Sequence, residues 1–274
     1  MTINCKGKLI DLNSPKVMGI VNITPDSFYD GGKHKDDASI LRQVENMLVN
    51  GATFIDIGAY SSRPGATEVS TSEELKRLLP VLHLILKEFP DILLSIDTFK
   101  GKVAEEAIQV GAAIINDISS GLLDEGMLTV IAKYNVPYIM MHMRGTPKTM
   151  QQYTDYENLI TDMLFFFSQQ TNKATSLGIK DIIVDPGFGF SKTLQQNYEL
   201  LNKLNLLKIT DKPILVGISR KSMIYKLLGT DPQNALNGTT ALNMLALEKG
   251  ANILRVHDVK EAMECVKIYD QLTA

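Results

Sequence analysis

Short apolar runs rich in Val and Ile recur along the chain at intervals of a few dozen residues. Longer stretches with helical spacing lie between them. Leu75, Leu78 and Leu82, for example, fall on one face of a predicted helix. This alternation predicts repeated βα units on a parallel sheet. We count eight predicted strands: Val17–Val21, Thr53–Ile57, Ile92–Ile96, Ala113–Ile115, Tyr138–Met141, Ile182–Val184, Ile214–Val216 and Ile253–Val256.

Eight strands alternating with helices favour a closed α/β barrel, the (β/α)₈ TIM barrel, although a doubly wound open sheet has the same local pattern. No G-x-G-x-x-G motif follows the first strand, and this absence also favours the barrel. The leading segment Ile3–Ile10 is predicted to form a short β-hairpin at the N-terminal end of the barrel. With 274 residues and 45% hydrophobic content, the chain can bury one large core, so we predict a single domain over residues 1–274.

Composition and charge exclude several classes of protein. The net charge of −3 and the pI near 5.9 argue against a general binder of nucleic acid or anionic membranes, because the overall field would attract neither. Cys5 and Cys265 are far apart and have no metal-binding spacing, so we expect neither a disulfide framework nor a zinc site. Residues 1–12 lack the apolar core of a signal peptide, and no segment is long and apolar enough to span a bilayer. We therefore predict a cytoplasmic protein.

Polar residues follow nearly every predicted strand, and in a closed barrel these positions meet at one mouth. They are Asn22, Ser61, Ser62, Arg63, Asp97, Asn116, Asp117, His142, Arg144, Asp185, Ser219, Arg220, Lys221, Ser222, Arg255, His257 and Asp258. We predict that this mouth is an active site. Its candidate anion-binding groups are Arg63, Arg220, Lys221, Arg255 and His257.

Each of these residues, taken alone, has a structural alternative, since an Asp, Asn or Ser after a strand is often the N-cap of the next helix. Asp258 fits such a cap, and Arg144 could be a solvated loop charge. Asp56 lies inside a strand, where a carboxylate must be hydrogen-bonded or paired, so we assign it to a structural network rather than to catalysis. The hypothesis of an active site depends on the convergence of the whole set.

Residues 187–193 imitate a phosphate-binding P-loop. Ser191, however, replaces the glycine required before Lys192, and the spacing from Gly187 is too short. We therefore expect no site for a nucleoside triphosphate in this segment.

Eight motifs, one after each strand, together resemble the dihydropteroate synthase family along nearly the whole chain. They are Asn22–Gly32, Ser61–Gly65, Ser95–Thr98, Ile115–Asp117, Met141–Pro147, Asp185–Phe190, Ser219–Ser222 and Arg255–Asp258. The resemblance implies a transferase that joins 6-hydroxymethyl-7,8-dihydropterin diphosphate to p-aminobenzoate, giving 7,8-dihydropteroate and pyrophosphate for folate biosynthesis. It also implies an SN1-like route, a Mg²⁺ cofactor and a homodimer formed through the later helices.

The family pattern also implies roles for particular residues of this chain. The pterin site would comprise Asp97, Asn116, Asp185, Lys221 and Arg255, because carboxylates can accept the paired N–H donors of an amino-pyrimidinone ring. The diphosphate site would comprise Asn22, Ser62, Arg63, Arg255 and His257, with Asn22 also contacting Mg²⁺. The p-aminobenzoate site would comprise Phe28, Pro64, Phe190, Lys221 and Ser222. The candidate catalytic residues are Asp97, Asp30, Lys221, Arg255 and His257.

The sequence departs from the family pattern at Tyr60 where we expect Glu, Ser62 for Thr, Ser191 for Gly, and Tyr225 for a small residue. Two rival functions remain. A pterin-binding methyltransferase shares the barrel and a similar Asp, Asn, Asp pocket, but it does not explain the motifs at residues 24–28, 219–222 and 255–258. A catalytically silent pterin-binding protein is the other, although all the expected binding positions are filled here.

Overall fold

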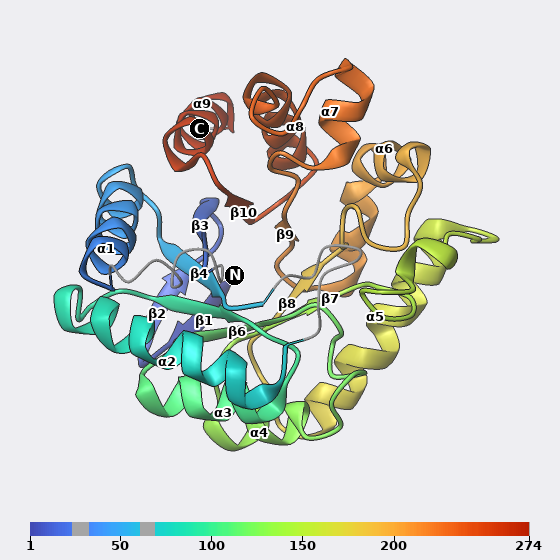
Figure 1. Ribbon diagram of the computed structural model, residues 1–274. Coiled ribbons are helices and arrows are strands. Elements are labelled where there is room, and N and C mark those ends of the chain that lie inside the picture. Colours follow the sequence, from blue (N-terminus) through green and yellow to red (C-terminus); the bar gives the residue numbers. More distant parts are fainter. Residues whose placement is uncertain (24–32, 61–68, 274) are drawn as a thin grey trace.

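The computed structural model describes residues 1–23, 33–60 and 69–273, with side chains in the first helix described from residue 37. A sheet of eight parallel strands forms the centre of the fold (Figure 1), in the order β8-β7-β6-β5-β4-β3-β10-β9. The strands are β3 (Lys16–Asn22), β4 (Phe54–Gly58), β5 (Leu94–Asp97), β6 (Ile114–Asp117), β7 (Tyr138–Met141), β8 (Ile182–Asp185), β9 (Leu215–Val216) and β10 (Ile253–Val256). A parallel bridge between Val184 and Ile214 joins β8 to the start of β9 and closes the barrel. The predicted TIM barrel is confirmed.

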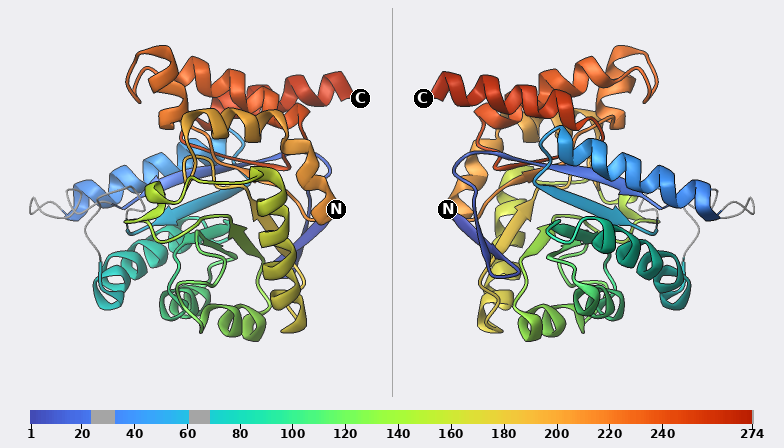
Figure 2. Two further views of the ribbon diagram at one scale, coloured as in Figure 1. Left: turned by 90° about the vertical axis from the view of Figure 1, so that its right-hand side faces the viewer. Right: turned by 90° about the vertical axis from the view of Figure 1, so that its left-hand side faces the viewer.

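Helices surround the sheet on its outer face (Figures 1 and 2). They are α1 (Lys33–Val49), α2 (Thr71–Glu88), α3 (Gly101–Val110), α4 (Met127–Tyr134), α5 (Leu159–Ser176), α6 (Leu194–Asn202), α7 (Ser222–Leu228), α8 (Leu236–Glu248) and α9 (Val259–Thr273), with 3₁₀ turns η2 (Met150–Gln152) and η3 (Leu204–Thr210). Local sequence sets several helix starts. The Ser70 hydroxyl accepts the Glu73 N–H before α2, and Thr193 and Gln196 form a capping box before α6. In the part of the chain that the structure describes, no helix could cross a bilayer.

The predicted hairpin is also confirmed. β1 (Thr2–Cys5) and β2 (Lys8–Asp11) pair antiparallel, and the two residues between them, Lys6 and Gly7, both have positive φ, as a tight hairpin turn requires. Ile3, Cys5 and Ile10 are buried while their neighbours are exposed, so one face of the hairpin packs against the barrel.

The two larger parts of the core differ in which face of the strands contributes to them. Outward-pointing side chains such as Ile55, Ile115 and Val184 pack with the helices. Inward-pointing side chains form a smaller cluster with the hairpin, and we call their row the lower layer. Its members are Met18, Phe54, Leu93, Ile114, Ile139, Ile183, Leu215 and Ile253. Alternation along each strand separates the two sets, because successive side chains point to opposite faces.

Several strands extend further at their carboxyl ends than the apolar runs predicted. β3 ends at Asn22, β5 at Asp97, β6 at Asp117 and β8 at Asp185. Backbone pairing continues there, for example between Asp97 and Asn116, although the side chains are polar. The prediction placed these residues just after the strands, because it used the end of the apolar run as the end of the strand.

Candidate active site

Polar side chains lie directly above the lower layer, inside the same barrel. On four strands the residue two positions after a lower-layer residue is an Asp, Asn or Arg, and a step of two keeps it pointing inward. The pairs are Phe54 and Asp56, Ile114 and Asn116, Ile183 and Asp185, and Ile253 and Arg255. We call Asp56, Asn116, Asp185 and Arg255 the upper layer. Its members come from β4, β6, β8 and β10, so residues far apart in sequence meet at the carboxyl end of the barrel.

Arg255 is the centre of this layer. Its Nε lies 2.6 Å from Asp56 Oδ2, and its Nη2 lies 2.9 Å from Asp97 Oδ2 at the end of β5. The Asn116 side-chain amide donates to the same Asp56 oxygen over 3.2 Å. Burial disfavours the guanidinium charge, but Asp56 and Asp97 outweigh that effect, so the pKa of Arg255 is raised. Asp56 therefore has the structural role that its place inside a strand predicted.

Of the two carboxylates that pair with Arg255, Asp97 is the one a ligand can reach, because 15% of its side chain is exposed and none of that of Asp56. Burial raises its pKa to about 7; Arg255 opposes the shift, whereas Asp56 adds to it. Among the described residues, no hydrogen-bond donor reaches Asp97 Oδ1. A buried carboxylate oxygen with no donor is costly. A bound molecule that supplies an N–H group to this oxygen would remove that cost.

Asp185 and Lys221 complete the cluster from the side of β8 and β9. Asp185 accepts a hydrogen bond from the Gly187 backbone over 2.8 Å, and burial raises its pKa while Lys221 lowers it. Lys221 donates to the Phe188 carbonyl over 2.5 Å, and its Nζ lies 4.9 Å from the centre of the Phe190 ring. Burial lowers the pKa of Lys221 to about 8, against the effect of Asp185. Arg255 and Asp97 also shift this pKa, so the charges of the cluster act on one another.

Known proteins match the chain over nearly its whole length, the residues of this cluster included. The family model described as pterin binding enzyme matches residues 18–257. The chain is 43% identical over 272 residues to the dihydropteroate synthase of Escherichia coli K12, covering 98% of this chain and 96% of that protein. The chain belongs to the dihydropteroate synthase family. A crystal structure of the Yersinia pestis dihydropteroate synthase with a sulfonamide drug complex matches with a TM-score of 0.93 and 44% identity, over 100% of this chain and 99% of that one.

A second solved relative is informative about ligands. The Xanthomonas albilineans dihydropteroate synthase with 4-aminobenzoic acid matches with a TM-score of 0.91 and 36% identity, over 100% of this chain and 98% of that one. The barrel architecture is thus shared over the full length with relatives that bind such molecules.

The remaining predicted residues fall into two groups. His257, after β10, has its Nδ1 3.0 Å from Ser219 Oγ, and its backbone N–H donates to that oxygen over 3.2 Å. Asn22 is exposed at the end of β3, Phe190 is half-buried beneath Lys221, and Ser222 is half-buried at the start of α7. The other predicted site residues, Phe28, Asp30, Ser62, Arg63 and Pro64, lie outside the described residues.

Two arginines that follow strands make ion pairs with other parts of the chain. Arg220 makes a two-bond ion pair with Asp258, and its Nη1 donates to the carbonyls of Pro232 and Gln233. Asp258 directly precedes α9 and its backbone carbonyl accepts the Ala262 N–H, so it takes the predicted N-cap position, while its carboxylate pairs with Arg220. Arg144 pairs with Asp162 over 2.8 Å. The guanidinium groups of Arg144 and Arg220 thus brace loops, and a sequence motif alone does not distinguish this use from anion binding.

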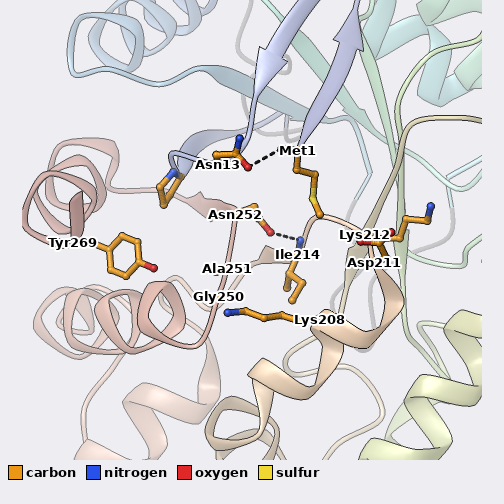
Figure 3. A pocket seen from close by; sticks show the side chains of 11 residues that line it. Met1, Asn13, Lys208, Asp211, Lys212, Ile214, Gly250, Ala251, Asn252 and Tyr269 are labelled. Atoms are coloured by element: carbon orange, nitrogen blue, oxygen red, sulfur yellow. Dashed lines mark hydrogen bonds between the residues drawn. The ribbon is translucent and has the colours of Figure 1, made fainter. Parts of the chain in front are cut away.

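A cavity of about 350 Å³ lies at the opposite end of the barrel (Figure 3). Asn13, Ile214 and Asn252, which come just before β3, β9 and β10, line it together with Lys208 and Tyr269. It is therefore separate from the polar cluster, and none of the residues predicted for the active site line it.

Proposed function

We propose that this chain condenses 6-hydroxymethyl-7,8-dihydropterin diphosphate with p-aminobenzoate, releasing pyrophosphate and forming 7,8-dihydropteroate in folate biosynthesis. The observation that carries this proposal is the buried cluster around Arg255, in which Asp97 presents an acceptor oxygen without a donor among the described residues. A pterin offers paired N–H donors and a carbonyl acceptor, so Asp97, Asp185 and Asn116 suit its donor edge and Lys221 suits its acceptor.

The proposed reaction begins with cleavage of the C–O bond between the pterin methylene and the diphosphate, and the electron pair leaves with the diphosphate oxygen. Positive charge then spreads from the methylene into the pterin ring. Ionised Asp97 stabilises that charge, while Arg255 and His257 stabilise the diphosphate. The neutral arylamine nitrogen of p-aminobenzoate donates its lone pair to the methylene carbon and then loses one proton to solvent. No strong general base is required before the attack, because the amine is neutral at pH 7.

The pterin and p-aminobenzoate sites would share one wall. Lys221 contacts both the Phe188 carbonyl and the Phe190 ring, and Ser222 follows it directly. We propose that Phe190 and Ser222 line the p-aminobenzoate site, with Phe28 and Pro64 as further candidates from the sequence. The relative that is described with 4-aminobenzoic acid supports p-aminobenzoate as a ligand of this chain.

We also propose Mg²⁺ as a cofactor that takes few of its oxygen ligands from the described residues. Asn22 is exposed at the end of β3 and offers one amide oxygen. Within the described residues, no group of three or more acidic, His or Cys side chains could hold a metal ion. This composition suits an ion that keeps several waters and takes most of its other oxygens from a diphosphate. Held there by Asn22, Mg²⁺ would neutralise charge on the diphosphate.

We also propose a homodimer formed through the later helices. Large apolar side chains are exposed on three neighbouring helices: Leu227 and Leu228 on α7, Leu245 on α8, and Ile268 and Leu272 on α9. Exposed apolar surface of this kind favours association. Light scattering after gel filtration would give twice the chain mass, and Leu245→Glu would shift the measured mass toward that of one chain.

A cytoplasmic location is consistent with the proposed substrates.

The decisive experiment is release of pyrophosphate that depends on p-aminobenzoate, measured at several Mg²⁺ concentrations. A dihydropteroate synthase releases one pyrophosphate for each dihydropteroate formed, and little without the amine. A silent pterin-binding protein would bind pterin without release. A methyltransferase would be inactive in this assay and would instead transfer methyl from a methylated folate. Either of these last two results would overturn the proposal.

A further inference from the structure

Lys192 is a buried cation that the proposed mechanism does not use. Its side chain is 4% exposed, and its Nζ lies 2.9 Å from the Gly187 carbonyl, 2.9 Å from the Phe190 carbonyl and 3.2 Å from His142 Nδ1. No carboxylate among the described residues lies within ion-pair distance of it. Burying a cation against neutral acceptors costs free energy, and burial lowers the pKa of this lysine to about 7.

The two carbonyls belong to the loop that builds one wall of the active site. Asp185 comes just before this loop, and its carboxylate accepts the Gly187 N–H over 2.8 Å. The Phe188 carbonyl, between the two that Lys192 binds, accepts the Lys221 ammonium over 2.5 Å. Lys192 and Lys221 thus bind neighbouring carbonyls of the same short loop. The loop is therefore fixed between two ammonium groups.

The loop also approaches the end of β7 closely. Gly187 has a φ of +68°, and a Cβ there would lie 2.2 Å from the His142 carbonyl, so only glycine fits. Ser191 has a φ of +51°, and its hydroxyl exchanges two 2.9 Å hydrogen bonds with the backbone N–H and carbonyl of Arg144. Both contacts hold the loop against the segment after β7, with Lys192 enclosed beneath it.

His142 is suited to be a neutral acceptor in this arrangement. It is 2% exposed, and its ring packs edge-on against Phe166 with 5.0 Å between ring centres. Burial, followed by the charge of Lys192, lowers the pKa of His142 well below its ordinary value. With Nδ1 accepting from Lys192, the ring proton resides on Nε2.

We propose that Lys192 is a positioning residue for the reaction. Its ammonium fixes the Gly187 and Phe190 carbonyls, and through them it sets the position of Asp185, of the Phe188 carbonyl that orients Lys221, and of the Phe190 ring. Its charge also favours the ionised form of Asp185. Lys192 touches neither substrate in this role. The inference rests on the proposed function, since it concerns the alignment of the same pterin and p-aminobenzoate sites.

The test is Lys192→Met, which keeps an unbranched buried side chain but removes every donor and the charge. At metal sites, removing a side chain that orients a ligand residue changes affinity or activity about 10–100-fold, and we expect a similar range here. We expect kcat/KM to fall within that range, the KM for both substrates to rise, and the Kd for 6-hydroxymethylpterin, measured by calorimetry without p-aminobenzoate, to rise as well. The melting temperature should stay within a few degrees of the wild type. The matched control is Lys203→Met, which removes an exposed lysine paired with Glu199 on α6.

A merely structural role gives a different result. The Met variant would then lose melting temperature and active fraction, while KM and the pterin Kd of the folded protein stayed at wild-type values, and that outcome overturns the inference. If Lys192→Met does not fold, Lys192→Gln decides, because it is polar but one bond too short to hold both carbonyls. A raised pterin Kd supports the inference and an unchanged Kd overturns it. Because pterin binding is measured without turnover, a wild type that binds pterin but releases no pyrophosphate would refute the proposed function alone.

Discussion

The lower and upper layers of the barrel interior are built by the same strands and are both buried, yet they serve different purposes. Phe54, Ile114 and Ile183 in the lower layer are all fully enclosed, and the N-terminal hairpin packs beneath them. Asp56 in the upper layer is equally enclosed, and Asp185 is 7% exposed. Burying apolar groups stabilises a fold, whereas burying charges costs free energy unless they are paired. The fold therefore gains its stability in one layer and accepts a cost in the next.

The pairing in the upper layer is incomplete in an informative way. Asp56 and Asp97 share Arg255, but the Oδ1 atom of each lacks a hydrogen-bond donor among the described residues. Sites that bind a ligand strongly often keep polar groups in this state, since the ligand supplies the missing partners. The difference between the layers thus predicts that mutations in one change stability and mutations in the other change chemistry.

The largest expected effect is in the lower layer. Phe54→Ala should lower the free energy of unfolding by about 3–5 kcal/mol, because it leaves a cavity under the strand that carries Asp56. Urea denaturation gives this quantity, and pyrophosphate release gives the turnover of the folded protein. We expect turnover to stay close to the wild-type value. A loss of turnover in fully folded protein would show that the two layers are not separable.

Asp97→Asn in the upper layer should lower turnover and leave the fold intact. Turnover should fall about 100- to 1,000-fold, because the variant loses the negative charge that would stabilise the developing cation. The fold should persist, since Arg255 keeps Asp56 as a partner. Asp91→Asn is the matched control: Asp91 is exposed near the amino end of the same strand and should tolerate the change. Near-normal turnover in Asp97→Asn would remove this residue from the mechanism.

Much of this arrangement could be predicted from sequence, because alternation and helical spacing reflect burial locally. The strand ends were less accurate: at Asp97 and Asp185 a polar side chain ends the apolar run while backbone pairing continues. Long-range partners could not be predicted. Arg255 contacts Asp56 across 199 positions of sequence, and no local pattern specifies that pair. In the sequence, Lys192 belongs to an imitation P-loop, and nothing there predicts the carbonyls that it binds, because backbone acceptors have no sequence signature.

A change of pH should have a smaller effect, on the affinity for pterin. The raised pKa of Asp97, about 7, means that the empty site gains a proton as the pH falls below 7, whereas bound pterin needs the ionised carboxylate. Affinity for 6-hydroxymethylpterin should therefore fall by up to about tenfold per pH unit below 7, which is about 1.4 kcal/mol per unit. Calorimetry from pH 5.5 to 8 measures it. Asp97→Asn should lack this component, and an identical pH dependence in both proteins would contradict the assignment.

The raised pKa of Asp97 also makes the stability of the empty protein depend on pH. The folded-state pKa lies above the unfolded value, so the empty protein binds the proton more tightly than the unfolded chain does. The stability contribution of Asp97 is therefore complete below about pH 4 and is lost as the pH rises through 7. Relative to the wild type, Asp97→Asn should gain melting temperature between pH 5 and 8. A parallel loss at every pH would instead indicate that its pairing with Arg255 stabilises the fold.

The smallest effect is expected at the hairpin that closes the lower layer. Gly7 has a φ of +81° and open space where a Cβ would lie, so Gly7→Ala adds only backbone strain, worth about 1 kcal/mol. Lys6→Gly is the matched opposite, because Lys6 has a φ of +54° and glycine relieves the strain there. In urea denaturation, the free energy of unfolding should be lower than the wild-type value for Gly7→Ala and higher for Lys6→Gly. Both should keep wild-type kcat and pterin Kd, since the hairpin packs against the apolar layer at the end of the barrel away from the polar cluster. A changed pterin Kd in either variant would show that strain at the amino end of the barrel reaches the site at its mouth.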